Sequence, residues 1–110
     1  MAVTGIWTVD YYGAFGWENA GVLVLEKGRA VGGGNNHFSI GTYESSGQSI
    51  TIELTLEYIG TPRTLFGEKQ RRFDIELHGR HTLKSMEGTV NRPDKKVIPL
   101  QFRMIRRAPL

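Results

Sequence analysis

The stretch ITIELTLEY (residues 50–58) decides the fold of this chain. Its apolar residues alternate strictly with threonine and glutamate, a pattern typical of a β-strand with one face in a core and the other in water. The segment RFDIELHG (residues 72–79) repeats the pattern, with Phe73, Ile75 and Leu77 on its apolar face. We therefore predict two half-buried strands in the middle of the chain.

Similar β-type runs extend outward from these two toward both ends of the chain. With residues 50–58 and 73–78, they predict eight strands, the others lying at residues 5–12, 19–26, 29–33, 37–43, 84–91 and 97–106. No stretch of ten residues has a helical period, and the nearest candidate, residues 61–72, is interrupted by Pro62 and Gly67. Gly28 is suited to a positive φ in a tight turn. Evenly spaced strands without a covering helix predict an all-β fold, a single closed up-and-down antiparallel barrel that spans residues 1–110 as one domain.

The interior of such a barrel is either filled by side chains or holds one small ligand. Alternation places a set of apolar residues inside, and these are the candidates for an interior binding surface: Ile52, Leu54, Leu56, Phe73, Ile75, Leu77, Leu100, Phe102 and Met104. Residues 19–26 are apolar on both faces, so we expect Leu23 and Leu25 to point outward as an exposed patch; the alternative is that a loop such as residues 59–69 covers them. Such a patch often marks an interface, here that of a homodimer.

Candidate chemistry is sparse. Glu53, Glu57, Asp74 and Glu76 fall on the wet faces of their strands, where no dry pocket raises the pKa of a general acid. His37, His78 and His81 are expected at surfaces or strand ends, without metal-site spacing. We therefore expect no catalytic residue, metal or cofactor. Only a cavity carrying buried Asp10 or Glu18, near the aromatic residues at 7, 11, 12 and 17, would favour an enzyme.

Composition narrows the class of protein further. The chain has 14 Lys and Arg against 11 Asp and Glu, a net charge of +3 and no cysteine, so disulfides are excluded. The two signs interleave, and we do not expect nucleic-acid binding. The longest apolar run, residues 22–25, is too short to span a bilayer. We expect a cytoplasmic protein, because the N-terminus lacks the features of a signal peptide.

Gly5, Ile6 and Trp7 open the first predicted strand. They resemble the Gly-x-Trp of lipocalin-like barrels, in which the indole closes one barrel end beneath an arginine of the last strand. Arg103 or Arg106 is the candidate for this contact, which would be a cation–π interaction. The alternative is that Trp7 is a core aromatic whose N–H bonds to backbone, while both arginines stay in solvent.

The order of landmarks resembles a narrower group, the GrlR-like family of small bacterial proteins. The landmarks are residues 5–9, 21–25, 28, 32–33, 41–43, 62–67, 73–79 and 99–102. The resemblance implies an eight-stranded lipocalin-like barrel that forms a homodimer. The family's namesake is a negative regulator of type III secretion genes, which binds an activator protein through an acidic Glu-Asp-Glu-Asp stretch. Here the candidate partner loop at that position is Glu44, Ser45, Ser46, Gly47 and Gln48, and only Glu44 is acidic.

The expected function is therefore a non-catalytic binding or regulatory barrel that acts through protein–protein contact. Because the acidic stretch is missing, the resemblance does not imply the same regulatory partner for this chain. The family's Gly-Gly-Asp also reads Gly33, Gly34 and Asn35 here. The alternative is a carrier or sensor of a small apolar ligand held in the barrel. A barrel filled by Leu54, Phe73, Phe102 and Met104 favours the first reading, and an empty cavity of a few hundred Å³ favours the second.

Overall fold

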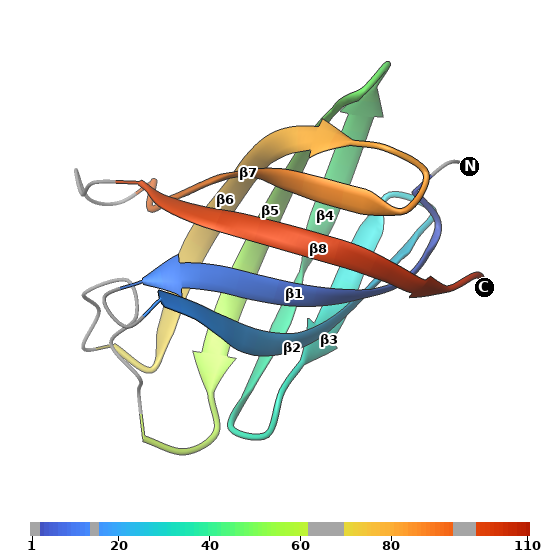
Figure 1. Cartoon of the computed structure of the whole chain (residues 1–110). Helices are drawn as coiled ribbons and strands as arrows, with labels where there is room; N and C mark the ends of the chain where they lie inside the picture. The colour runs from blue at the N-terminus through green and yellow to red at the C-terminus, as the bar shows by residue number, and fades with distance from the viewer. Residues whose placement is uncertain (1–2, 14–15, 62–69, 94–98) are drawn as a thin grey trace.

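The chain forms a closed antiparallel β-barrel, seen in a computed structural model that describes residues 3–13, 16–61, 70–93 and 99–110 (Figure 1). Each strand pairs with the next along the chain, and β8 pairs with β1 to close the barrel. The strands are β1 (Gly5–Gly13), β2 (Gly16–Glu26), β3 (Arg29–Gly33), β4 (His37–Ser46), β5 (Ser49–Tyr58), β6 (Arg72–His81), β7 (Ser85–Asn91) and β8 (Leu100–Ala108). The predicted all-β, up-and-down, eight-stranded barrel is confirmed.

The strand limits differ from the prediction at a few places. β4 continues to Ser46, because Gly47 and Gln48 alone form the turn to β5, with Gly47 at a φ of 60°. The expected turn over residues 44–48 is therefore too long by its first three residues. Gly28 has a φ of 80° beside Lys27 at 53°, as a tight hairpin requires. Residues 62–69, within the interrupted helix candidate, and residues 97–98, at the predicted start of the last strand, lie outside the described residues.

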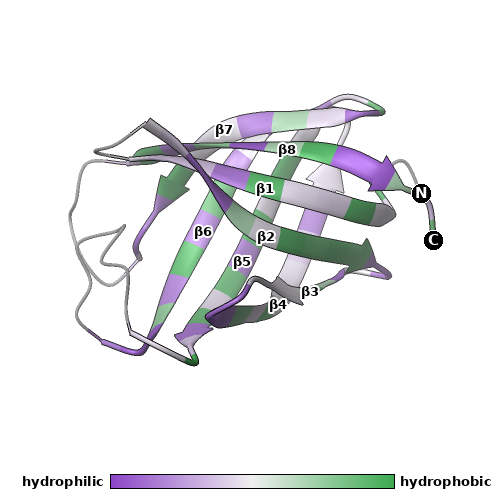
Figure 2. Ribbon diagram, turned by 60° about the horizontal axis from the view of Figure 1, so that its bottom comes forward, coloured by the Kyte–Doolittle hydropathy of each residue, from purple (hydrophilic) through white to green (hydrophobic). Residues whose placement is uncertain are grey.

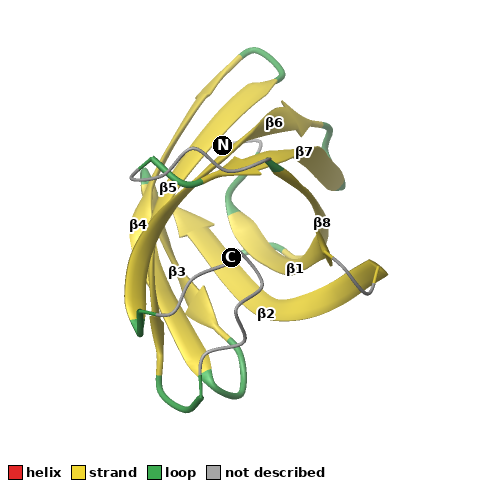
Figure 3. Cartoon of the chain, turned by 90° about the vertical axis from the view of Figure 1, so that its left-hand side faces the viewer, coloured by secondary structure: helices red, strands yellow, loops and turns green. Residues whose placement is uncertain are grey.

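The two barrel ends differ in their connections. The end that contains Trp7 also carries the short turns β2–β3, β4–β5 and β6–β7, and we call it the closed end. The opposite end carries the β3–β4 connection and the longer β5–β6 and β7–β8 connections, and we call it the mouth. Figure 3 views the barrel from the mouth side. None of the described residues forms a helix of the length and apolarity that a membrane span needs.

A single hydrophobic core fills the barrel between these ends. Trp7, Leu25, Ile52, Leu77 and Phe102 are among its most deeply buried side chains. Eight of the nine predicted interior residues are buried, and Leu100 is partly buried against the core. The period-two pattern of β5, β6 and β8 therefore predicts the interior correctly.

Strand β2 breaks the alternation at Gly21. Thr8 pairs with Val22 but Asp10 pairs with Asn19, so Ala20 and Gly21 together oppose one residue of β1. This is a β-bulge, and Gly21 adopts a φ of 92° in it. Leu23 and Leu25 point into the core, at 3% and 0% exposure, so the expectation that they form an outer patch is wrong.

The valines of β2 form the exposed patch instead. Val24 pairs with Val31 of β3, Val31 pairs with Ile40 of β4, and Phe38 lies on the same outer surface two residues before Ile40. We call Val22, Val24, Val31, Phe38 and Ile40 the outer apolar face; all but the half-buried Val24 are exposed. Figure 2 shows that the second half of β2 is hydrophobic, and Val22 and Val24 are its residues on this face.

Candidate ligand-binding site

A hollow of about 340 Å³ opens at the mouth, and we call it the mouth hollow. Its wall comes from three places: β1 and the first half of β2, the β3–β4 connection, and the last residues of β5. The polar side chains in the wall include Glu18, Asn35, Asn36 and His37. The volume falls within the usual range of small-molecule sites. The structure therefore holds a candidate binding site at the rim rather than in the middle of the barrel.

Buried side chains separate the mouth hollow from the core. Tyr11, Leu56 and Tyr58 line it and are 3%, 3% and 5% exposed. Burial raises the pKa of the Tyr11 hydroxyl above its ordinary value, and the neighbouring Tyr58 raises it further. Tyr11 is therefore a neutral phenol at physiological pH. The floor is aromatic and uncharged.

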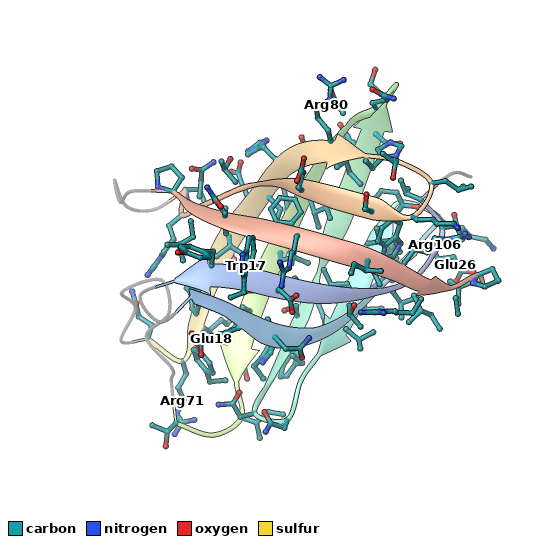
Figure 4. The ribbon with its side chains drawn as sticks, in the orientation of Figure 1. Trp17, Glu18, Glu26, Arg71, Arg80 and Arg106 are labelled. Carbon is teal, nitrogen blue, oxygen red and sulfur yellow. The ribbon has the colours of Figure 1, made fainter. Side chains whose placement is uncertain are left out.

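The β-bulge brings Glu18 into this site. Glu18 pairs with Tyr11 across β1 and β2, so both side chains lie on the inner surface of the sheet, while Trp17 points outward. Asn19 holds the bulge from outside: its Oδ1 accepts from the Gly21 N–H at 3.0 Å, and its Nδ2 donates to Asp10 Oδ1 at 3.2 Å. Figure 4 shows Glu18 on β2 at the mouth end of the barrel. Without the extra residue, strict alternation from Leu23 would turn Trp17 inward in place of Glu18.

An aromatic pair forms part of the wall. The rings of His37 and Tyr58 lie 6.4 Å apart, inclined at 66°. Tyr58 in turn lies 6.1 Å from Phe73, whose ring carries the Arg92 guanidinium 4.8 Å from its centroid. This row of rings and one cation fixes the position of Tyr58 from behind. The hollow thus has an aromatic side.

The closed end is organised around Trp7 and Arg106. Trp7 is completely buried, and its Nε1 donates to the carbonyl of Val3 at 3.0 Å. Arg106 pairs with Trp7 across β1 and β8, but its guanidinium donates to the carbonyl of Thr4 at 2.9 and 3.2 Å. Both residues thus hold the segment that precedes β1. The indole N–H bonds to backbone, as the alternative interpretation of Trp7 has it.

Arg103 does not take part in closing this end. It lies on the outer surface, where its guanidinium is 4.2 Å from the centroid of the Trp17 ring and its Nε donates to Asp10 at 3.0 Å. Of the two arginines considered for the contact with Trp7, Arg103 therefore does not make it, and Arg106 is the cross-strand neighbour of Trp7. The reason is the alternation of β8: Phe102 and Met104 point inward, so Arg103 between them points outward.

The other predicted site residues are spread over the molecule. Of the nine predicted interior residues, Leu56 is the one that lines the mouth hollow. Glu44, Ser45, Ser46, Gly47 and Gln48 are exposed at the closed end, far along the strands from the hollow. Asp10 faces outward, so of the two carboxylates singled out in the sequence Glu18 is in the hollow and Asp10 is not.

The histidines occupy three different environments. His37 lines the mouth hollow, His78 contacts Glu76 at 3.1 Å on the outside, and His81 is buried at the end of β6. His81 therefore lies at a strand end, one of the two expected positions, and its side chain is buried. Across the described ranges, no group of three His, Asp or Glu side chains is placed to hold a metal ion.

A second hollow, of about 320 Å³, lies on the outer surface over β4, β5 and β6. Glu53 and Glu76 line it and are direct cross-strand neighbours, beside Asp74. Thr55 donates to Asp74 at 2.7 Å, and His78 contacts Glu76. Asp74 and Glu76 thus already have polar partners on the surface, and the hollow resembles a solvated sheet face.

Comparison with protein-family models and curated proteins identifies no relative of this chain. No protein-family model matches the chain, and no curated protein matches it significantly. The class of the protein is therefore defined by its fold, an eight-stranded up-and-down barrel consistent with the lipocalin-like architecture, and by the mouth hollow.

Several residues of the hollow are not evident from the sequence. Asn35 and Asn36 follow a glycine run and are predicted there as a connection, and His37 is predicted as the first residue of the next strand. The sequence signal for a site here is that three polar side chains follow an apolar strand, next to glycines, which have no side chain to fill a hollow. The alternation of residues 50–58 predicts Tyr58 on the inner face of its strand. That it lies at the mouth follows from its position as the last residue of β5, which the alternation alone does not give.

Proposed function

We propose that the protein is a non-catalytic binding protein that holds one small molecule in the mouth hollow. The observation that carries this proposal is the hollow of about 340 Å³ above Tyr11, Leu56 and Tyr58. Small eight-stranded barrels commonly bind a single ligand at or inside such an opening. The mixed lining fits a molecule with an apolar body and one polar group.

The filled core limits the depth at which a ligand binds. Leu54, Phe73, Phe102 and Met104 are all at most 5% exposed and pack within the barrel below the hollow. A long aliphatic chain that threads the barrel axis is therefore not the ligand that we propose. The ligand is short and sits at the rim.

Binding of an uncharged fluorescent dye, N-phenyl-1-naphthylamine, tests this proposal on the full chain. We expect a saturable rise in dye fluorescence with one site per chain. Ala20→Phe should abolish it, because Ala20 lines the hollow and a phenyl group there fills the space. The matched control is Thr89→Phe on the exposed outer surface of β7, which should bind the dye as the wild type does. Equal binding by the two variants would contradict the proposal.

A second proposal is the homodimer that the GrlR-like resemblance implies. The outer apolar face favours it, because five neighbouring apolar side chains on a barrel exterior are typical of an interface. We propose a second copy of the chain as the occupant. A two-fold interface opposes each patch to itself, and this patch holds no charge that would meet its own copy.

A further inference from the structure

Strand β3 is shorter than the two strands that flank it. It has 5 residues, against 11 in β2 and 10 in β4, and of β2 it pairs only with residues 22–26 (Figure 1). Residues 16–19 of β2 pair with β1 on one side, and on the other side they pair with no strand that the structure describes. We call residues 16–19 the β2 edge, because they form an unpaired strand edge in the wall of the barrel.

Two residues of the β2 edge direct their backbone groups away from β1. In an antiparallel pair, residues that exchange both hydrogen bonds alternate with residues whose N–H and C=O point to the opposite side. Gly13 and Gly16 pair across only two intervening residues, as the hydrogen-bonded pair that closes a hairpin does. The N–H and C=O of Trp17 and Asn19 therefore point away from β1. Among the described residues, these backbone groups have no hydrogen-bond partner.

The mouth hollow lies where a longer β3 would continue. β3 ends at Gly33, and the chain then turns, with the Gly34 N–H donating to the His37 carbonyl at 3.0 Å. The carbonyl of Asn36 accepts from the Ile59 N–H at 2.7 Å, so this connection is held beside the end of β5. The lining of the hollow includes residues of the β2 edge and of this connection, and the hollow thus separates the two.

The hollow can receive a side chain from a strand that pairs with the β2 edge. Successive side chains of such a strand point to opposite faces of the sheet, so every second one points to the inner face. On that face lie Tyr11, Leu56 and Tyr58, the buried floor of the hollow. The space of about 340 Å³ above them accommodates one large apolar side chain.

We propose that the β2 edge binds an extended peptide segment of another protein, which adds as a strand beside Trp17 and Asn19 and places one apolar side chain in the mouth hollow. In this mode of recognition, backbone hydrogen bonds give affinity and the pocket gives sequence preference. An unpaired strand edge is a template for such pairing. The inference rests on the proposed function, since it names the ligand class of the same hollow.

Amide hydrogen exchange of the full ¹⁵N-labelled chain tests whether the edge is free. We expect the Trp17 and Asn19 amides to exchange rapidly in the absence of a ligand. The Leu23 amide, within the part of β2 that pairs on both sides, should exchange slowly. Slow exchange of the Trp17 and Asn19 amides would show that another part of the chain already covers the edge, and would overturn the proposal.

The probe for binding is the uncharged peptide acetyl-Thr-Val-Phe-Val-Thr-amide. It should slow the exchange of the Trp17 and Asn19 amides and shift the signals of Ala20 and Gly34, which line the hollow. The same peptide with serine in place of phenylalanine should bind about tenfold more weakly, because the hollow then holds no large apolar side chain. Equal binding of the two peptides would contradict the placement of a side chain in the hollow.

Two variants at one position separate backbone pairing from the side chain of Trp17. Trp17→Pro removes the N–H that the peptide would bond, and the barrel should tolerate this because the N–H faces an unpaired edge. Trp17→Ala is the matched control, since it loses the same ring and keeps the N–H. We expect the peptide to bind about fivefold more weakly to Trp17→Pro than to Trp17→Ala, and the dye to bind both variants equally.

The outcomes separate the added strand from the proposed function. If the dye binds in the hollow but the peptide leaves the Trp17 and Asn19 amides unprotected, the added strand is wrong and small-molecule binding stands. Equal peptide binding by Trp17→Pro and Trp17→Ala also contradicts the added strand. If neither the dye nor the peptide binds, the proposed function fails and the inference fails with it.

Discussion

Trp7 and Trp17, the two tryptophans of the chain, lie in opposite environments. Trp7 is fully buried and Trp17 is 37% exposed. We expect Trp7→Ala to lower the free energy of unfolding by about 3–5 kcal/mol, as large-to-small changes in a packed core do. Denaturant titration followed by circular dichroism measures this. Trp17→Ala, the control, should cost about 1 kcal/mol for its contacts with Arg103 and Tyr12. A loss below about 1 kcal/mol for Trp7→Ala would contradict its role in the closed end.

Tyr11 makes the free energy of unfolding depend on pH in the alkaline range. Its pKa is raised in the folded state, so the folded protein holds the phenol proton more tightly than the unfolded chain does. The resulting stability is fully present below the unfolded pKa of about 10 and is lost as pH rises toward the folded value. We expect the unfolding free energy to fall above about pH 10, and to fall less steeply in Tyr11→Phe. Tyr12→Phe, which changes a 47% exposed ring, should keep the wild-type slope; an unchanged slope in Tyr11→Phe would contradict the prediction.

At the scale of the element, the β2 bulge depends on Gly21. A Cβ there would lie 2.1 Å from the Gly33 carbonyl oxygen, on a backbone with a φ of 92°. Gly16, on the same strand, has a φ of 91° and nothing within 4 Å of a Cβ. We expect Gly16→Ala to cost about 1 kcal/mol for strain alone, and Gly21→Ala about 3 kcal/mol because a clash adds to it. Thermal and denaturant unfolding measure both; equal costs would show that the close approach to Gly33 is unimportant.

The same bulge marks how far sequence predicts structure here. In β5 and β6 every apolar residue alternates with a polar one, and their inward faces follow from period two. In β2 both faces are apolar, so the pattern does not choose between Leu23 and Val24. The choice depends on the extra residue opposite β1 and on the approach of Gly33, which are contacts between strands. For the same reason Glu18 could be singled out from the sequence, but its position beside Tyr11 in a hollow could not.

On the scale of the whole molecule, the outer apolar face predicts self-association. We expect the proposed homodimer at tens of micromolar in sedimentation equilibrium. Ile40→Glu should give a monomer with little change in stability, because Ile40 is 48% exposed and loses few core contacts. Ile105→Glu is the matched control, since Ile105 is 41% exposed on β8, outside the outer apolar face, and should leave the dimer intact. A wild-type monomer, or a dimer unaffected by Ile40→Glu, would contradict this interface.

The pairing of β8 with β1 has a consequence for how the chain reaches this structure. Seven of the neighbour pairs join strands that follow one another in the sequence, whereas the eighth joins residues 5–13 to residues 100–108. During synthesis β1 is made before the other seven strands, and one of its edges stays unpaired until β8 is made. Contacts between residues so distant in sequence slow the final step of folding, and open strand edges at that stage invite association with other chains. The barrel is therefore completed only after residues 100–108 have left the ribosome and can pair with β1.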